Sequence, residues 1–257
     1  MTPPPLLSVH GLTVTIAGHR VCGGLELAVR PGECWAILGR NGAGKTTLLH
    51  TLAGLRAAAA GVIELDGRPL ASLAARDVAR LRGVLPQDDS DAFPATVLET
   101  VLVGRHPHLS RWQWEGADDI RIAREALVAA DMGGTEGRDI RTLSGGERRR
   151  VALAALLAQQ PRLFLLDEPS SHLDLSHQIG LLDRLVSKVR ADGRALVMVV
   201  HDVNLALRYC DQALLLSGGE AFAGPAPALL TTERLSALYG VPLRALAGPR
   251  GKVFAPE

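Results

Sequence analysis

The hydrophobic positions of this chain follow two alternating patterns. Short runs rich in leucine and β-branched residues, typical of buried strands, occur at 34–38, 62–65, 163–166, 196–200 and 213–216. Segments with apolar residues at helical spacing separate most of these runs. Because strands that alternate with helices form parallel sheets covered on both faces, the pattern predicts an α/β fold with a mainly parallel sheet.

The middle of the chain departs from this alternation. Helical patterns dominate at 96–104, 117–131 and 144–159, and no convincing strand pattern lies among them. We therefore predict that a helical subdomain is inserted into the α/β core.

These patterns predict a single domain that spans 1–257. Its catalytic core would consist of approximately 1–89 and 161–240, and the helical subdomain would span approximately 90–160. Residues 241–257 show no usable pattern and are expected to form a C-terminal tail.

Composition and charge exclude several classes of protein. A chain of 257 residues that is 47% hydrophobic can bury a sizeable core, which excludes a disordered or fibrous protein. Its 28 Lys and Arg nearly balance 27 Asp and Glu, so we expect no nucleic-acid partner. The apolar run at 151–160 is far shorter than the roughly 20 residues of a spanning helix, and residues 1–7 do not resemble a secretory signal. We expect a protein that stays in the cytoplasm.

A glycine-rich segment provides the first chemical motif. GRNGAGKT at 39–46 satisfies GxxxxGK[ST] and lies between the apolar run CWAIL and a helix-like run. Glycine lets the backbone approach phosphate closely, and the amides of the loop and of the following helix N-terminus face its negative charge. Lys45 would reach the β- and γ-phosphates, and Thr46 would hold Mg²⁺. The predicted nucleotide-binding residues of this P-loop are Gly39, Arg40, Asn41, Gly42, Ala43, Gly44, Lys45, Thr46 and Thr47.

Two carboxylates follow a later apolar run, LFLL at 163–166. Downstream of a P-loop, Asp167 at the strand end can bind Mg²⁺ through water, and Glu168 can orient or deprotonate the attacking water. A strand that ends in a solvated acidic turn is the alternative, which the upstream P-loop disfavours.

A third motif carries a family resemblance. LSGGE at 143–147, shortly before LFLLDEP, resembles the signature of the ATP-binding-cassette (ABC) ATPases, and the three motifs occur in that family's order. The resemblance covers approximately residues 7–239. It implies a P-loop NTPase core with a mainly parallel sheet, an N-terminal antiparallel β part and an inserted helical subdomain.

The signature also implies a second copy of the chain. Ser144, Gly145 and Gly146 offer a hydroxyl and bare amides at the start of a helix, which suits a phosphate. In the family, two subunits pair head to tail so that each signature completes the other subunit's P-loop around ATP. The segment SHLD at 171–174 resembles the D-loop that crosses this interface, which implies that Asp174 belongs to the nucleotide site.

Two further residues resemble family elements. Gln87 in VLPQD resembles the Q-loop glutamine, which is expected to touch Mg²⁺ and the attacking water. His201, after the strand run ALVMVV, resembles the switch histidine that contacts the γ-phosphate. The resemblance therefore implies Glu168 as general base, with His201 and Gln87 completing the catalytic set. It also implies ATP as substrate and Mg²⁺ held by Thr46, Gln87 and Asp167.

One position departs from the family pattern. Family members often place an aromatic residue before the core to stack on adenine, but this chain offers Ile16 or Ala17 there. We therefore expect weaker base stacking, which leaves the preference for ATP over GTP open.

The helical subdomain contains a segment that suggests the branch of the family. FPATVLETVLVGRHPH at 93–108 resembles the importers of ferric siderophores, haem and cobalamin. The resemblance implies an ATPase that powers a membrane importer for an iron chelate or cobalamin. Its partners would be an integral membrane permease and, indirectly, a substrate-binding protein. Its location would be peripheral, on the cytoplasmic face of the inner membrane.

Alternatives remain within the family. An ABC ATPase of an iron–sulfur assembly machine has a similar length and no permease, and an exporter differs little in its cassette. A DNA-repair or translation cassette would need tandem cassettes or a coiled-coil insertion, and this chain has one cassette and no heptad run.

Side chains outside these motifs receive mostly structural interpretations. We expect Cys22, Cys34 and Cys210 to be buried, and His106 and His108 to belong to a structural loop. We expect Asp88, Asp89 and Asp91 to be solvated or to face a permease, and Arg148, Arg149 and Arg150 to lie on a solvated or interface surface. Trp112 and Trp114 could equally contact a partner or pack locally.

Overall fold

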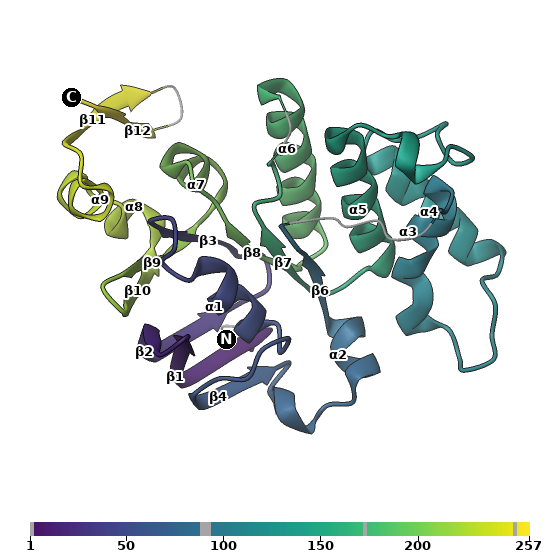
Figure 1. Ribbon diagram of the computed structural model, residues 1–257, viewed down its shortest axis with the longest axis horizontal. Helices are drawn as coiled ribbons and strands as arrows, with labels where there is room; N and C mark the ends of the chain where they lie inside the picture. The colour runs from purple at the N-terminus through teal and green to yellow at the C-terminus, as the bar shows by residue number, and fades with distance from the viewer. Residues whose placement is uncertain (1–2, 88–93, 172–173, 249–250) are drawn as a thin grey trace.

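The computed structural model describes residues 3–87, 94–171, 174–248 and 251–257. Its central sheet has the strand order β10-β9-β3-β8-β7-β6, and all neighbours are parallel except β9 and β10 (Figure 1). This arrangement confirms the predicted α/β fold with a mainly parallel sheet. In chain order the strands are β3 (Cys34–Gly39), β6 (Arg82–Leu85), β7 (Leu163–Asp167), β8 (Ala195–Val199), β9 (Gln212–Ser217) and β10 (Glu220–Pro225).

A second, antiparallel sheet forms the N-terminal β part. Its strand order is β2-β1-β4-β5, with β1 (Leu7–Ile16), β2 (His19–Val29), β4 (Ala60–Leu65) and β5 (Arg68–Pro69). The assignment of the run at 62–65 to the parallel sheet was wrong, because β4 pairs antiparallel with β1. A short apolar run indicates burial, but the direction of its neighbour depends on where the connecting chain returns. The strand β6 had no recognised pattern.

Helices cover the central sheet and extend beyond one end of it (Figure 1). The predicted helical patterns in the middle of the chain are confirmed as three α-helices, each slightly shorter than its pattern. Short 3-10 helices occur at Leu70–Ser72, Val103–His108 and Ile140–Thr142. The α-helices are α1 (Lys45–Leu52), α2 (Ala75–Leu81), α3 (Val97–Leu102), α4 (Ala117–Ala129), α5 (Gly145–Gln159), α6 (Leu175–Ala191), α7 (Val203–Tyr209), α8 (Ala226–Leu229) and α9 (Thr232–Tyr239).

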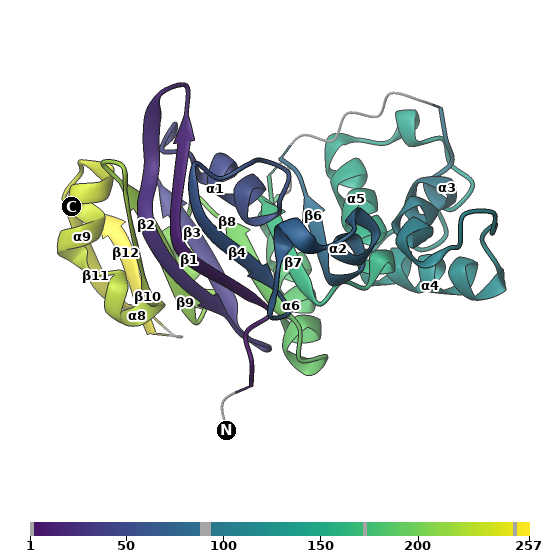
Figure 2. The same cartoon turned by 90° about the horizontal axis from the view of Figure 1, so that it is seen from below.

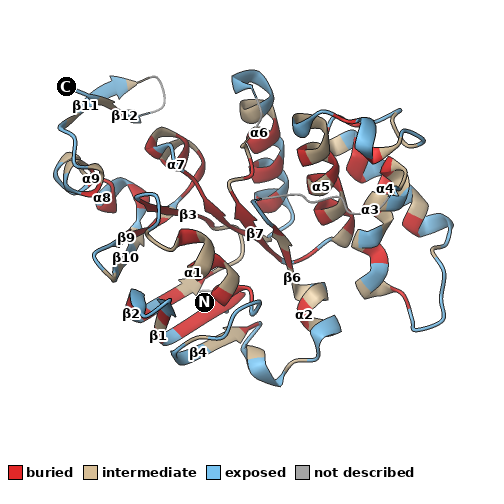
Figure 3. Ribbon diagram, viewed as in Figure 1, coloured by how far each residue is buried: buried red, intermediate tan, exposed pale blue. Residues whose placement is uncertain are grey.

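The parallel strands are buried on both faces, and alternate residues pack into two hydrophobic cores (Figure 3). Phe164 and Leu166 of β7 join the core with α5, α6 and α7. Leu163 and Leu165 join the core with α1 and the antiparallel sheet, which lies across the strands in Figure 2. Successive strand residues point to opposite faces, so one continuous apolar run serves both cores.

The helices α3, α4 and α5 pack against one another. Arg105 and Asp119 form a nearly buried ion pair there, with 2.9 Å between Nε and Oδ1, and Arg105 Nη1 donates to the carbonyl of Ala158 at 2.7 Å. His108 Nε2 lies 2.8 Å from the carbonyl of Gln159. These contacts give the GRHPH segment a structural role. Within the described residues, no helix is both long and apolar enough to cross a membrane.

The C-terminal residues form a hairpin where no pattern was recognised. The strands β11 (Leu243–Gly248) and β12 (Gly251–Pro256) pair antiparallel. Asn204 of α7 fixes β12 through two hydrogen bonds with the backbone of Phe254, whose side chain is buried. The hairpin thus packs on the helix that follows His201.

Candidate functional site

The sheet topology gathers the predicted catalytic groups at one edge. The strands β3, β8, β7 and β6 run parallel, so their carboxyl ends lie side by side. The P-loop follows β3, Asp167 ends β7, and His201 comes two residues after β8. Ligands of open α/β sheets bind at this edge. Residues more than 150 positions apart in the sequence therefore meet in one site.

The P-loop has the geometry that its sequence predicts. Gly42 and Gly44 have φ angles of 79° and 88°, a region that favours glycine. A Cβ on Gly44 would lie 2.6 Å from Val21 Cγ2, so glycine also permits β2 to pack against the loop. Lys45 begins α1 and is buried, and its Nζ donates to the carbonyls of Gly39 and Arg40 at 3.0 and 3.2 Å. Burial lowers the pKa of Lys45, while the Glu168 and Asp167 carboxylates oppose that shift.

Asp167 has the surroundings of a cation ligand. It is fully buried, and neither carboxylate oxygen has a hydrogen-bond partner among the described residues. Burial raises the pKa of Asp167, and the nearby Thr46 hydroxyl acts in the opposite direction. Burying an ionised carboxylate without a partner is costly, and a cation relieves that cost. Asp167 and Thr46 therefore fit Mg²⁺.

Glu168 and His201 meet directly. Glu168 Oε1 lies 2.5 Å from His201 Nε2. Glu168 has a φ of 48°, which is unusual for a residue with a side chain. Such a strained backbone at the end of a strand is typical of functional sites. The sequence predicted both residues, and the structure brings them together.

The signature residues lie at the start of a different element. Ser144 caps α5: its Oγ accepts from the amide of Glu147 at 3.2 Å, and Glu147 Oε2 accepts from the amide of Ser144 at 2.8 Å. These bonds and the Arg138 guanidinium lower the pKa of Glu147 to about 2. The helix α5 packs against α3, α4 and β6, whereas α1 packs against β1, β3, β7 and β8 (Figure 1). The structure therefore does not bring Ser144, Gly145 and Gly146 to the P-loop of the same chain.

The other predicted residues lie around the site with less definite contacts. Gln87 is exposed two residues beyond β6. Asp174 caps α6, and its exposed carboxylate accepts from the His177 amide at 2.9 Å, which helps to lower its pKa to about 2. The middle of the D-loop, His172 and Leu173, lies outside the described residues. Ile16 is 39% exposed at the end of β1, where the family's aromatic was expected.

Arg149 is the main residue that sequence reasoning missed. The interpretation of the arginine row as a solvated or interface surface was wrong for Arg149, which is only 2% exposed. Its guanidinium donates to the carbonyls of Asp167 and Glu168 at 2.6 and 3.0 Å. The helical spacing of the sequence indicates this burial, because Arg149 precedes Leu153 and Leu156 by four and seven residues and so lies on the buried face of α5.

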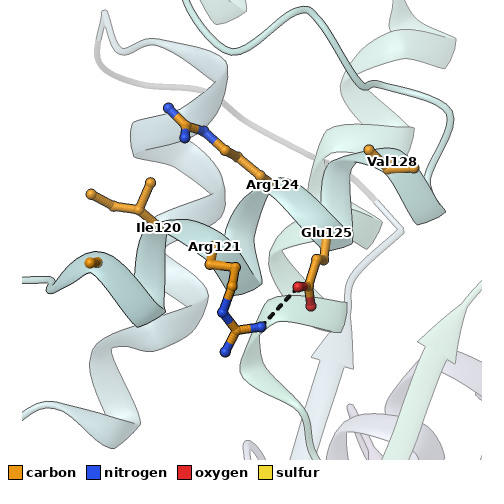
Figure 4. Close-up of a pocket in the computed structure, with 6 residues that line it drawn as sticks. Ile120, Arg121, Arg124, Glu125 and Val128 are labelled. Atoms are coloured by element: carbon orange, nitrogen blue, oxygen red, sulfur yellow. Dashed lines mark hydrogen bonds and ion pairs between the residues drawn. The ribbon is translucent and has the colours of Figure 1, made fainter.

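The remaining expectations concern groups outside the site. The cysteines are buried, as predicted, and all three are free thiols. Trp112 and Trp114 are 87% and 86% exposed, so they do not pack locally into the core. Asp88, Asp89, Asp91 and Phe93 lie outside the described residues. A concavity of approximately 630 Å³ on α4 holds a surface ion pair, Arg121 with Glu125, and no predicted site residue (Figure 4).

Known proteins resemble this chain over nearly its whole length. The sequence model of a family described as ABC transporter matches residues 22–171. The hemin import ATP-binding protein HmuV of Nocardia farcinica is 44% identical over 95% of this chain and 85% of its own length. The protein of the same name from Streptomyces coelicolor is 42% identical, over 96% and 90%.

Solved structures agree with the sequence comparison. One described as a metal-chelate type ABC transporter in an inward-facing conformation superposes with a TM-score of 0.86 and 29% identity, over 98% of both chains. An ABC exporter of the Atm1 family, with ATP bound, shares the fold with a TM-score of 0.76. The chain belongs to the ABC transporter family, as an ATPase.

Proposed function

We propose that this chain binds and hydrolyses ATP to power a membrane importer for an iron chelate, with haem as the first candidate cargo. The observation that carries the cargo class is the 42–44% identity, over at least 95% of the chain, to ATPases named for hemin import. The structural neighbour described as a metal-chelate transporter supports the same class. The contact between Glu168 and His201 beside the P-loop supports the hydrolytic chemistry.

Hydrolysis needs a base for the attacking water and positive charge on the phosphates. Glu168 acts as the general base, because its carboxylate lies at the edge of the sheet where the γ-phosphate would face it. His201 fixes one oxygen of that carboxylate and, with nucleotide bound, contacts the γ-phosphate. Lys45 and the P-loop amides stabilise the charge that develops on the phosphates.

The divalent cation has a suitable set of ligands. The buried Asp167 and the Thr46 hydroxyl would hold Mg²⁺, and Gln87, two residues beyond β6, would complete the set. When bound, Mg²⁺ supplies positive charge to the β- and γ-phosphates.

A second copy of the chain completes each nucleotide site. The exposed N-terminus of α5 carries Ser144 and Gly145 away from the P-loop of its own chain, so another subunit must present them. ATP would then close a head-to-tail dimer, and its hydrolysis would reopen it. Asp174, at the N-terminus of α6, would lie at the same interface.

The transport path belongs to partners. We propose an integral membrane permease that receives the motion of the dimer, and a substrate-binding protein that delivers the chelate. The chain would then be peripheral on the cytoplasmic face of the inner membrane.

Purification from native membranes in mild detergent tests this proposal. We expect a polytopic permease to copurify, and we expect its ATPase activity in proteoliposomes to rise with a haem-loaded binding protein. The Glu168→Gln complex is the control for contaminating ATPases. Stimulation by a siderophore- or cobalamin-loaded protein instead would identify that chelate, and not haem, as the cargo. Recovery only with assembly proteins, or a permease without a binding protein, would favour an assembly machine or an exporter.

A further inference from the structure

We propose that Arg149 is a positioning residue that holds the catalytic base and links it to the signature helix. This inference rests on the proposed role of Glu168 as general base. Arg149 lies on the first turns of α5, five residues after the helix cap Ser144. One charged side chain thus joins the signature helix to the backbone of Asp167 and Glu168.

The contacts of Arg149 span three elements. Nη2 donates to the carbonyls of Asp167 at 2.6 Å and Glu168 at 3.0 Å, at the end of β7. Nη1 donates to the carbonyl of Pro86, just after β6, and the carbonyl of Gln87 lies 3.5 Å away. The planar guanidinium can donate to several carbonyls at once, whereas the ammonium of lysine lacks this fixed, forked arrangement of N–H donors. Arg149 therefore links α5 to the backbone around Gln87 and to the backbone of Asp167 and Glu168.

The bond to Glu168 acts on a strained residue. A φ of 48° is unfavourable for glutamate, so the neighbouring bonds must hold this conformation. The Glu168 carbonyl accepts from Arg149 Nη2 and from the amide of Ser171 at 3.1 Å. If the Arg149 bond is lost, the peptide can relax, and the carboxylate shifts away from His201. Arg149 thus contacts the backbone of the base.

This arrangement also gives the signature a route to the base. When the nucleotide of a partner binds at the N-terminus of α5 and shifts this helix, Arg149 would shift with it. Its bond to the Glu168 carbonyl would then transmit the shift to the Glu168 peptide. Completion of the composite site would thereby act on the backbone that carries the carboxylate.

The test separates positioning of the base from general stability. We expect Arg149→Gln to lower kcat about 10- to 100-fold while the ATP dissociation constant changes less than about threefold, because a displacement near 1 Å costs a rate factor of that size. Arg149→Lys keeps the charge but loses the forked arrangement of donors, so it should lower kcat by about tenfold. It provides the test if Arg149→Gln does not fold. Arg190→Gln is the matched control: it removes a helical arginine that pairs with Asp211 at the opposite edge of the sheet, and it should leave kcat unchanged.

A double-mutant cycle gives the decisive readout. Single-turnover rates with labelled ATP are compared for Arg149→Gln alone, Glu168→Gln alone and both together, in the permease complex if the isolated chain is inactive. A positioning role predicts that Arg149→Gln costs less than about twofold once Glu168 is replaced, because the group it positions is gone. An equal loss in both backgrounds, or a parallel loss of ATP affinity, would overturn the inference. If Glu168→Gln alone leaves turnover intact, the proposed base itself is wrong.

Discussion

The two parts of the chain that are expected to face nucleotide are constructed differently. The carboxyl edge of the central sheet collects Lys45, Asp167, Glu168 and His201 from distant positions. Lys45 and Asp167 are buried there, and the backbone of Glu168 is strained where its carboxylate meets His201. The start of α5 is local and exposed, and the reciprocal bonds of Ser144 and Glu147 order it. Burial and strain at the sheet edge lower the stability of the folded state but serve the chemistry. The start of α5 is already ordered and is accessible to a partner. Substitutions in the two parts should therefore affect different measurements.

The largest effect is expected from Glu168→Gln. Removing the general base should lower ATP turnover by about 10²- to 10⁴-fold, while nucleotide binding persists because the P-loop is intact. ATP should then trap a head-to-tail dimer, which light scattering would detect. Hydrolysis at the unmodified rate, or a monomer with bound ATP, would contradict the assignment.

Lys45→Ala should affect binding rather than chemistry alone. Its ammonium is the point cation of the P-loop, so calorimetry should show ATP affinity lowered by about 10- to 100-fold, the range of one or two charge-assisted hydrogen bonds. Lys188 provides a control, because Lys188→Ala removes an exposed ammonium on α6 that pairs with Asp192, outside the site. Unchanged affinity in Lys45→Ala would exclude this site as the nucleotide site.

Asp167→Asn should raise the free energy of unfolding of the ligand-free protein, whereas most substitutions in a core lower it. Because burial raises the pKa of Asp167, the folded state binds a proton more tightly than the unfolded state does, and ionisation at neutral pH destabilises the apo protein. The variant should gain about 1 kcal/mol in the free energy of unfolding without ligand. It should lose the additional stabilisation by Mg²⁺ with ATP. Thermal unfolding at neutral pH with and without both ligands measures these two effects, and a lower apo midpoint would refute the prediction.

The difference between the two parts also explains what the sequence could predict. A contiguous motif predicted the P-loop, the upstream P-loop favoured a catalytic interpretation of the paired carboxylates, and the family resemblance singled out the signature at the start of α5. The family order placed His201, but only the parallel topology shows its 2.5 Å contact with Glu168. Arg149 was misassigned because its carbonyl partners come from two other elements, and carbonyls carry no sequence signal.

The fold was predictable to a similar degree. Apolar runs located most strands of the central sheet, because burial on both faces leaves a continuous pattern. The strand β4 was placed in the wrong sheet, since its partner β1 lies about 50 residues earlier and a run of four residues does not specify direction. The hairpin of β11 and β12 was missed, because most of its side chains are exposed and Phe254 alone provides a buried anchor.

The smallest effect is expected at the signature helix, from Glu147→Gln. The folded state lowers the pKa of Glu147 to about 2, well below its ordinary 4.5, so the ionised carboxylate stabilises the folded state above pH 4.5. This contribution disappears as the pH falls from 4.5 towards 2. The variant should therefore lose about 0.5–1 kcal/mol at neutral pH, as for a charge at a helix N-terminus, and the gap to the unmodified protein should close in that acidic window. Glu125→Gln, which breaks an exposed ion pair with Arg121, controls for surface charge. A gap that stays constant from pH 7 to pH 3 would show that the carboxylate does not order the start of α5.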